Sequence, residues 1–145
     1  MSSAAESPAA APQQVSDLPS RFQTPYLSTE DLKCAKAIAS TIWIKQNTAK
    51  VLIAMQRYGD GTAITSRWLE YVCDLRQPEV SIAMGFLLEG NLVSVRENKA
   101  DSKGRPVKVY ILVGDVPLYL HKKLQERKNS FEKGAADLRK MFPGV

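Results

Sequence analysis

The chain has few residues of the kinds that build metal sites, redox sites or catalytic centres. It holds two cysteines, Cys34 and Cys73, whose spacing matches no metal or redox motif. The one histidine, His121, has no Cys, Asp or Glu partner at the spacing of a metal site or a catalytic triad, so we expect it to be an exposed helical residue. A glycine-rich loop that cradles phosphates is also absent from the sequence. We therefore expect no catalytic residues, no metal and no cofactor.

Long apolar runs are missing as well. No stretch approaches the roughly 18 uncharged apolar residues that cross a bilayer. The first residues show neither a basic n-region nor an apolar h-region. We expect no membrane partner, and the low cysteine content favours a reducing compartment, the cytoplasm. Cys73 is expected to be a small core residue, whereas Cys34 leaves a thiol sensor open as an alternative.

What remains has the composition of one folded unit. The 145 residues are too few for two full domains and a linker, and 44% hydrophobic with 24% charged residues is close to the globular average. Twenty Lys and Arg against fifteen Asp and Glu give a net charge of +5. This excess favours an anionic partner without naming it.

The first part of the chain predicts a tail followed by a helix. Residues 1–27 are rich in Ser, Ala, Pro and Gln and offer little apolar surface, so we expect a flexible tail. A helix is predicted over 29–44, with Ser28 as its cap and acidic residues in its first turn. Its apolar residues at helical spacing include Leu32, Ile38 and Ile42.

The middle of the chain predicts two helices joined by a tight turn. A second helix is expected over 48–58, and a short third helix breaks at 74–76. The fourth helix opens at Gln77–Pro78, because Pro suits a first helical turn, and ends at 89–91. The residues expected to point inward are Leu69, Val72 and Cys73 in the third helix and Val80, Met84 and Leu87 in the fourth.

Two β-prone segments and a long helix complete the pattern. Residues 92–96 and 107–112 alternate in polarity and should pair as an antiparallel hairpin. A final helix follows Pro117. The fold class is therefore mainly α with a small β-hairpin (α+β): a winged helix-turn-helix over 28–114 with flanking N- and C-terminal helices, the latter in 115–145.

Three segments resemble a known family. Asp74-Leu-Arg-Gln-Pro-Glu-Val-Ser-Ile-Ala-Met84 is similar to the turn and recognition helix of archaeal winged-helix transcriptional regulators of the broad ArsR, MarR and TrmB type. Gly90-Asn-Leu-Val93 resembles the lead into their wing, and Gly104–Leu112 resembles the returning wing strand. The resemblance implies a homodimer that places two recognition helices about 34 Å apart on double-stranded DNA.

The fourth helix offers polar side chains to a major groove. Arg76 suits a phosphate or a guanine edge, Gln77 suits adenine, and Ser81 suits either backbone or base. The alternative is that Arg76 and Gln77 only begin a solvated helix, with Gln77 as its cap. The residues of this helix expected to be available to DNA are Arg76, Gln77, Pro78, Glu79, Ser81 and Ile82, with Ala83 near the boundary.

The hairpin carries the stronger electrostatic signal. From residue 96 to 108 its five basic residues outnumber its two acidic ones, a net charge of +3. Gly104 would let the tip turn and Arg105 suits a narrow minor groove, while the lysines would neutralise phosphates. An ordinary charged hairpin tip is the alternative. The residues expected to contact DNA here are Arg96, Lys99, Lys103, Gly104, Arg105 and Lys108.

The last helix predicts a dimer. Leu124, Phe131 and Leu138 recur every seven residues, with Phe142 beside them, although Lys128 interrupts the seam. Packing within one chain is the alternative for these residues and for the apolar stripe of the first helix.

Taken together, these features predict a sequence-specific regulator of transcription that binds double-stranded DNA. The outer face of the fourth helix is poor in basic residues, and Glu79 would repel phosphate unless it accepts a hydrogen bond. Ile82 and Phe86 would pack on thymine methyl groups, on the first helix or on another protein. The alternative function is therefore a winged-helix protein-interaction module of the transcription or chromosome machinery. The sequence locates no site for a small-molecule effector.

Overall fold

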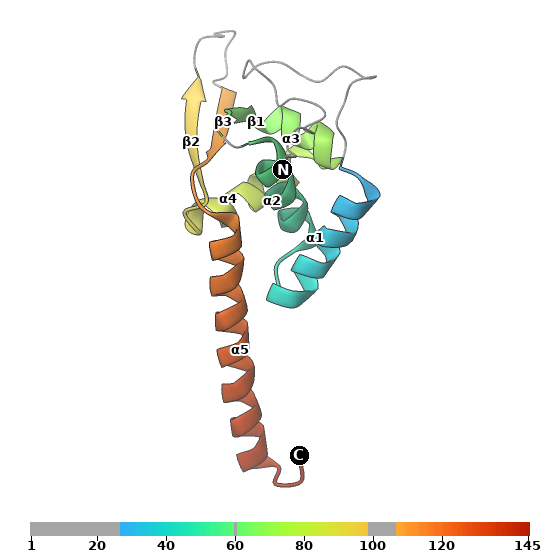
Figure 1. Cartoon of the computed structure of the whole chain (residues 1–145), viewed down its shortest axis with the longest axis vertical. Helices are drawn as coiled ribbons and strands as arrows, with labels where there is room; N and C mark the ends of the chain where they lie inside the picture. Colours follow the sequence, from blue (N-terminus) through green and yellow to red (C-terminus); the bar gives the residue numbers. More distant parts are fainter. Residues whose placement is uncertain (1–26, 60, 99–106) are drawn as a thin grey trace, which may run out of the picture.

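The computed structural model describes residues 27–59, 61–98 and 107–145 (Figure 1). Five helices and three short strands occupy these ranges. The predicted tail over 1–27 lies outside the described residues except for Leu27, which is buried in the core. In chain order the elements are α1 (Thr29–Ile42), α2 (Gln46–Tyr58), β1 (Ile64–Thr65), α3 (Ser66–Cys73), α4 (Gln77–Glu89), β2 (Val93–Asn98), β3 (Val107–Leu112) and α5 (Val116–Met141).

The start of α1 is fixed by its cap, as predicted. The Ser28 hydroxyl accepts a hydrogen bond from the Asp31 backbone N–H, and Asp31 Oδ2 accepts one from the Ser28 N–H, both at 3.1 Å. Asp31 Oδ1 also accepts from Arg57 Nη2 on α2 at 2.6 Å, which ties α1 to α2. The helix ends two residues earlier than predicted, because Trp43 adopts a left-handed conformation with φ of 59°.

The tight turn between α3 and α4 lies where the sequence predicts it. The Thr65 hydroxyl caps α3 by accepting a hydrogen bond from the Trp68 N–H at 3.0 Å. Asp74 then takes a left-handed conformation with φ of 56°, which ends α3 and reverses the chain. The fourth helix begins at Gln77 with Pro78 in its first turn.

The core is built where α2, α3 and α4 meet. Trp68 of α3 lies against Tyr58 of α2 in an edge-to-face arrangement with a centroid distance of 5.3 Å. The helix α4 contributes Val80, Ala83, Met84 and Leu87, all buried. The expectation that Ala83 lies at the boundary of the outer face was wrong, since this residue is 1% exposed.

The sheet has three strands in the order β1–β3–β2, all antiparallel. The predicted hairpin is present as β2 and β3. The short strand β1, in which Ile64 pairs with Tyr110 and Thr65 with Val109, was not predicted. Two residues are too few to show the alternation that reveals a strand. Through this pairing, β1 ties the hairpin strand β3 to the start of α3.

The second half of the long helix α5 projects away from the rest of the molecule (Figure 1). Asp115 caps it by accepting a hydrogen bond from the Leu118 N–H at 2.9 Å, and its buried residues are Val116 and Tyr119. Trp43 is 70% exposed, and its ring centroid lies 3.1 Å from the guanidinium carbon of Arg127 on α5. None of the described helices has the length and apolarity needed to cross a membrane.

Candidate nucleic-acid interface

One face of α4 is docked on the core while the opposite face is open to solvent. Val80, Met84 and Leu87 are buried, as predicted. On the outer face, Ile82 is 58% exposed, and no described element covers it. The other predicted contact residues that are exposed are Arg76, Gln77, Pro78 and Ser81.

Glu79 acts locally at the start of α4. Its Oε1 atom accepts a hydrogen bond from the Arg76 backbone N–H at 2.8 Å, and the side chain is partly buried. The residue that precedes the helix is thus Arg76, and Gln77 is its first residue rather than its cap. The Glu79 carboxylate therefore caps the first turn of α4.

Phe86 does not belong to the outer face. It packs against the core, and the ammonium of Lys123 on α5 lies 5.7 Å from its ring centroid. The same ammonium lies 5.6 Å from the ring of Tyr119. Phe86 therefore joins α4 to α5, and of the two apolar residues singled out in the sequence, Ile82 is the one presented outward.

The turn from α4 into β2 fixes the hairpin relative to α4. Asn91 takes the left-handed conformation, with φ of 58°, and the Leu92 N–H donates to the Leu87 carbonyl at 3.0 Å. A Cβ atom on Gly90 would lie 2.7 Å from Cε1 of Tyr119, so only glycine lets α5 approach this turn. The turn, α4 and the start of α5 are consequently one packed unit.

The described part of the hairpin presents two of the predicted basic residues. Arg96 and Lys108 are both exposed. In the register of β2 and β3, Lys108 is directly opposite Glu97 and Arg96 is opposite Val109, so Arg96 and Lys108 lie on opposite faces of the hairpin. Lys99, Lys103, Gly104 and Arg105 lie outside the described residues.

The structure also places the side chains that could bind a metal ion or react. Among the described residues, no three His, Cys, Asp or Glu side chains are placed to hold a metal ion. His121 and Cys34 are exposed. Cys73 is buried, as predicted, and burial raises the pKa of its thiol to about 12, so it stays protonated at neutral pH.

The predicted dimerisation residues form an exposed row along α5. Leu124, Phe131 and Leu138 are exposed, and Phe142 follows the helix directly. Phe131 is 69% exposed. Packing of this row within one chain, the alternative left open by the sequence, does not occur in the described residues.

Comparisons with known proteins bear on the fold. No protein-family model and no curated protein sequence matches the chain. A solved structure described as a possible transcriptional regulator from Methanosarcina mazei Go1 superposes with a TM-score of 0.56 at 15% identity, covering 72% of this chain and 88% of that one. The chain has a winged-helix fold. The adhesin competence repressor AdcR from Streptococcus pyogenes also matches, at 13% identity and a TM-score of 0.43, over 78% of this chain and 84% of that one.

Proposed function

We propose that the protein is a double-stranded DNA-binding regulator of transcription that inserts α4 into the major groove. The observation that carries this proposal is the two-sided character of α4, whose inner face is fully docked while its outer face is open at its N-terminal half. An α-helix fits the major groove, and residues near its N-terminus reach base edges. A regulator neighbour of the same fold is consistent with this role.

The outer face of α4 would supply a small number of contacts with different purposes. Arg76 and Gln77 extend from the first turn and would contact a phosphate or guanine and an adenine edge, respectively. Ser81 would bind backbone or base, and exposed Ile82 would pack on a thymine methyl group. With few base contacts, most of the affinity would come from phosphates.

The hairpin and its connecting segment, called the wing below, would supply those phosphate contacts. Because Arg96 and Lys108 lie on opposite faces of the hairpin, they would reach phosphates on the two sides of a groove. The segment between β2 and β3 adds Lys99, Lys103 and Arg105. We assign Arg105 to the minor groove and the lysines to the backbone.

We also assign dimerisation to α5. Helix α5 leaves the core after Tyr119, and its exposed row of Leu124, Phe131 and Leu138, with Phe142, has the seven-residue spacing of a helix-pairing seam. Burying one such side chain contributes about 1.5–3 kcal/mol, so four per chain would offset the cost of association. A two-fold dimer would present two α4 helices to one duplex.

A salt-dependent binding titration tests the proposal. Fluorescence anisotropy of a labelled duplex would be measured from about 50 to 200 mM salt with the parent and with Lys103→Ala/Arg105→Ala. The lost charges should weaken binding to all duplexes, and the loss of the Lys103 phosphate contact should lower the salt slope by about 0.9. The matched control is Lys133→Ala/Arg139→Ala on the distal part of α5, which removes the same charge.

Two outcomes would contradict the proposal. If the protein binds no duplex at 50 mM salt, the alternative function, a winged-helix protein-interaction module, would be favoured. Equal losses in the wing and α5 variants would show attraction by net charge alone, without a role for the wing.

A further inference from the structure

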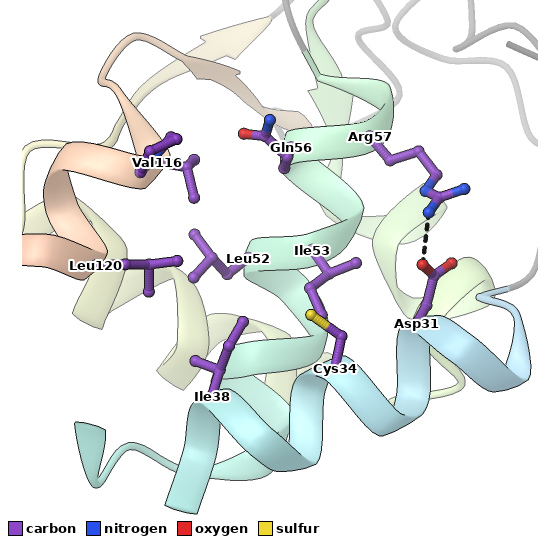
Figure 2. Close-up of a pocket in the computed structure, with 10 residues that line it drawn as sticks. Asp31, Cys34, Ile38, Leu52, Ile53, Gln56, Arg57, Val116 and Leu120 are labelled. Carbon is purple, nitrogen blue, oxygen red and sulfur yellow. Dashed lines mark hydrogen bonds and ion pairs between the residues drawn. The ribbon is translucent and has the colours of Figure 1, made fainter. Parts of the chain in front are cut away.

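A pocket of about 460 Å³ lies where α1, α2 and the start of α5 meet. Figure 2 shows its walls: Cys34 and Ile38 come from α1, Leu52 and Ile53 from α2, and Val116 and Leu120 from α5. Sites for small molecules typically have volumes of about 300–1,000 Å³. Its lining residues come from α1, α2 and α5 and not from α4 or the hairpin, so it is separate from the proposed DNA interface.

Most of the pocket wall is apolar. Leu52 and Val116 belong to the buried core, whereas Ile38, Ile53 and Leu120 are only partly buried and turn exposed surface toward the pocket. Apolar surface left in contact with water costs about 25 cal/mol per Å², so a molecule with an apolar body gains free energy by covering it. Ile53 and Leu120 pack against the core on one side and line the open space in Figure 2 on the other.

The opposite end of the pocket is polar but has no net charge. Asp31 and Arg57 form an ion pair at 2.6 Å there, and Gln56 also lines the pocket, with its amide on the side of Val116 in Figure 2. Both Asp31 oxygens are engaged, one by Arg57 and the other by the Ser28 N–H. Within the described residues, Arg57 makes a single hydrogen bond, through Nη2, so its guanidinium keeps N–H donors for another acceptor.

This arrangement selects against a charged ligand. A carboxylate bound to the free N–H donors of Arg57 would lie close to the buried Asp31 carboxylate, and the two like charges would repel each other. An ammonium group at the same end of the pocket would be repelled by the positive guanidinium of Arg57. A hydroxyl or amide, by contrast, accepts from Arg57 or Gln56 without breaking the ion pair.

We propose that this pocket binds a neutral small molecule with an apolar body and one hydroxyl or amide group, the polar group lying at the Asp31–Arg57 pair. The apolar body would contact Ile38, Ile53 and Leu120 and bridge all three helices. Binding would therefore hold the start of α5 against α1 and α2. The proposal concerns ligand binding alone and does not depend on DNA binding.

Three probes with one apolar body and different polar groups test the proposal. The full chain would be titrated by calorimetry with 2-naphthalenemethanol, 2-naphthoate and 2-naphthylmethylammonium. The alcohol should bind at least about tenfold more tightly than either ion, a difference of about 1.4 kcal/mol. The titration would be repeated over a hundredfold range of protein concentration.

Cys34 reports on occupancy without any substitution. Its thiol is exposed and lines the pocket, while Cys73 is buried and serves as the internal reference. The bound alcohol should slow maleimide modification of Cys34 severalfold. Two variants that fill the pocket from different walls, Cys34→Trp and Leu120→Trp, should each abolish alcohol binding, and Cys34→Ser, which conserves the size of the side chain, should retain it.

Several results would overturn the proposal. They are equal or tighter binding of the carboxylate, binding of the alcohol without protection of Cys34, and no measurable binding of the alcohol at millimolar concentration. Binding that weakens as protein concentration rises would show that a second copy of the chain occupies the pocket. Because the protection assay uses the unaltered chain, misfolding of a variant does not leave the proposal undecided.

Discussion

At the scale of single residues, the two cysteines show how packing sets the properties of one side-chain type. Cys73 lies in the core with its Sγ atom 3.7 Å from the Lys50 carbonyl oxygen, whereas Cys34 lies on the exposed side of α1. Burial raises the pKa of the Cys73 thiol to about 12, and nearby Lys50 lowers it by a smaller amount. In the unfolded chain, a cysteine has a pKa near 8.5.

This difference predicts a loss of stability at alkaline pH. Between about pH 8.5 and pH 12 the unfolded chain releases the Cys73 proton while the folded chain keeps it, so the free energy of unfolding falls as pH rises, by up to about 1.4 kcal/mol per pH unit. Below pH 8.5 both states are protonated and this contribution is constant. Urea unfolding from pH 8 to pH 10 measures the slope.

The comparison uses Cys34→Ser with and without Cys73→Ala, so that Cys73 is the one thiol that differs. Removing Cys73 should flatten the dependence on pH over this range. The tyrosines with raised pKa values, Tyr58, Tyr110 and Tyr119, are present in both proteins and cancel. Identical slopes would argue against a protonated, buried thiol.

Residue environments were predictable where a local pattern determined them and not where a distant contact did. Ser28 and Pro78 occupy the helix starts that their chemistry favours, because a cap depends on residues within one turn. Trp43, by contrast, is exposed and contacts Arg127, which lies 84 positions later in the chain. Nothing in the neighbourhood of Trp43 in the sequence indicates that contact.

At the scale of elements, α4 and the turn that follows it were predicted from local sequence. Its inward residues follow from helical spacing, and the Gly90–Asn91 turn follows from the conformations that these residues allow. The strand β1 was missed because its two residues form a strand only through pairing with β3. Helices could thus be predicted from local sequence, whereas the strand β1 depends on a partner far away in the sequence.

The position of Gln77 in α4 predicts a specific effect on recognition. Gln77→Ala should change the preferred base at one position of each half-site by about 1–3 kcal/mol of discrimination, with a small effect on binding to random duplex. Selection of bound sequences from a random duplex pool measures this preference. Gln125→Ala, an exposed glutamine of α5, is the control and should leave the selected sequence unchanged.

At the scale of the whole molecule, the projecting α5 helix determines how two copies would assemble. Its seven-residue repeat was visible in the sequence, but the point at which it leaves the core was not, because that depends on the packing of Tyr119 against Gly90. A chain ending near Gly114 would lose the buried Val116 and Tyr119, so truncation there would disturb the core as well as the dimer. Surface substitutions test assembly without this loss.

Phe131→Glu/Leu138→Glu should convert the dimer to a monomer while the fold is retained. Each glutamate would place a negative charge in the apolar dimer interface, where it would face the glutamates of the second chain and be repelled by them. Light scattering gives the mass, and circular dichroism checks the helix content. Lys133→Glu changes the charge on another side of the same helix, and its dimer should persist. If the unaltered protein is monomeric at tens of micromolar, the dimerisation role proposed for α5 is wrong.

The most direct test of the central claim is a photocrosslinking measurement on the outer face of α4. A benzophenone amino acid at Ser81, irradiated with duplex DNA at 50 mM salt, should crosslink to the DNA, whereas the same group at Lys133 on distal α5 should not. A protein that binds the duplex but crosslinks from position 133 and not from position 81 would contradict the account, as would a protein that binds no duplex at all.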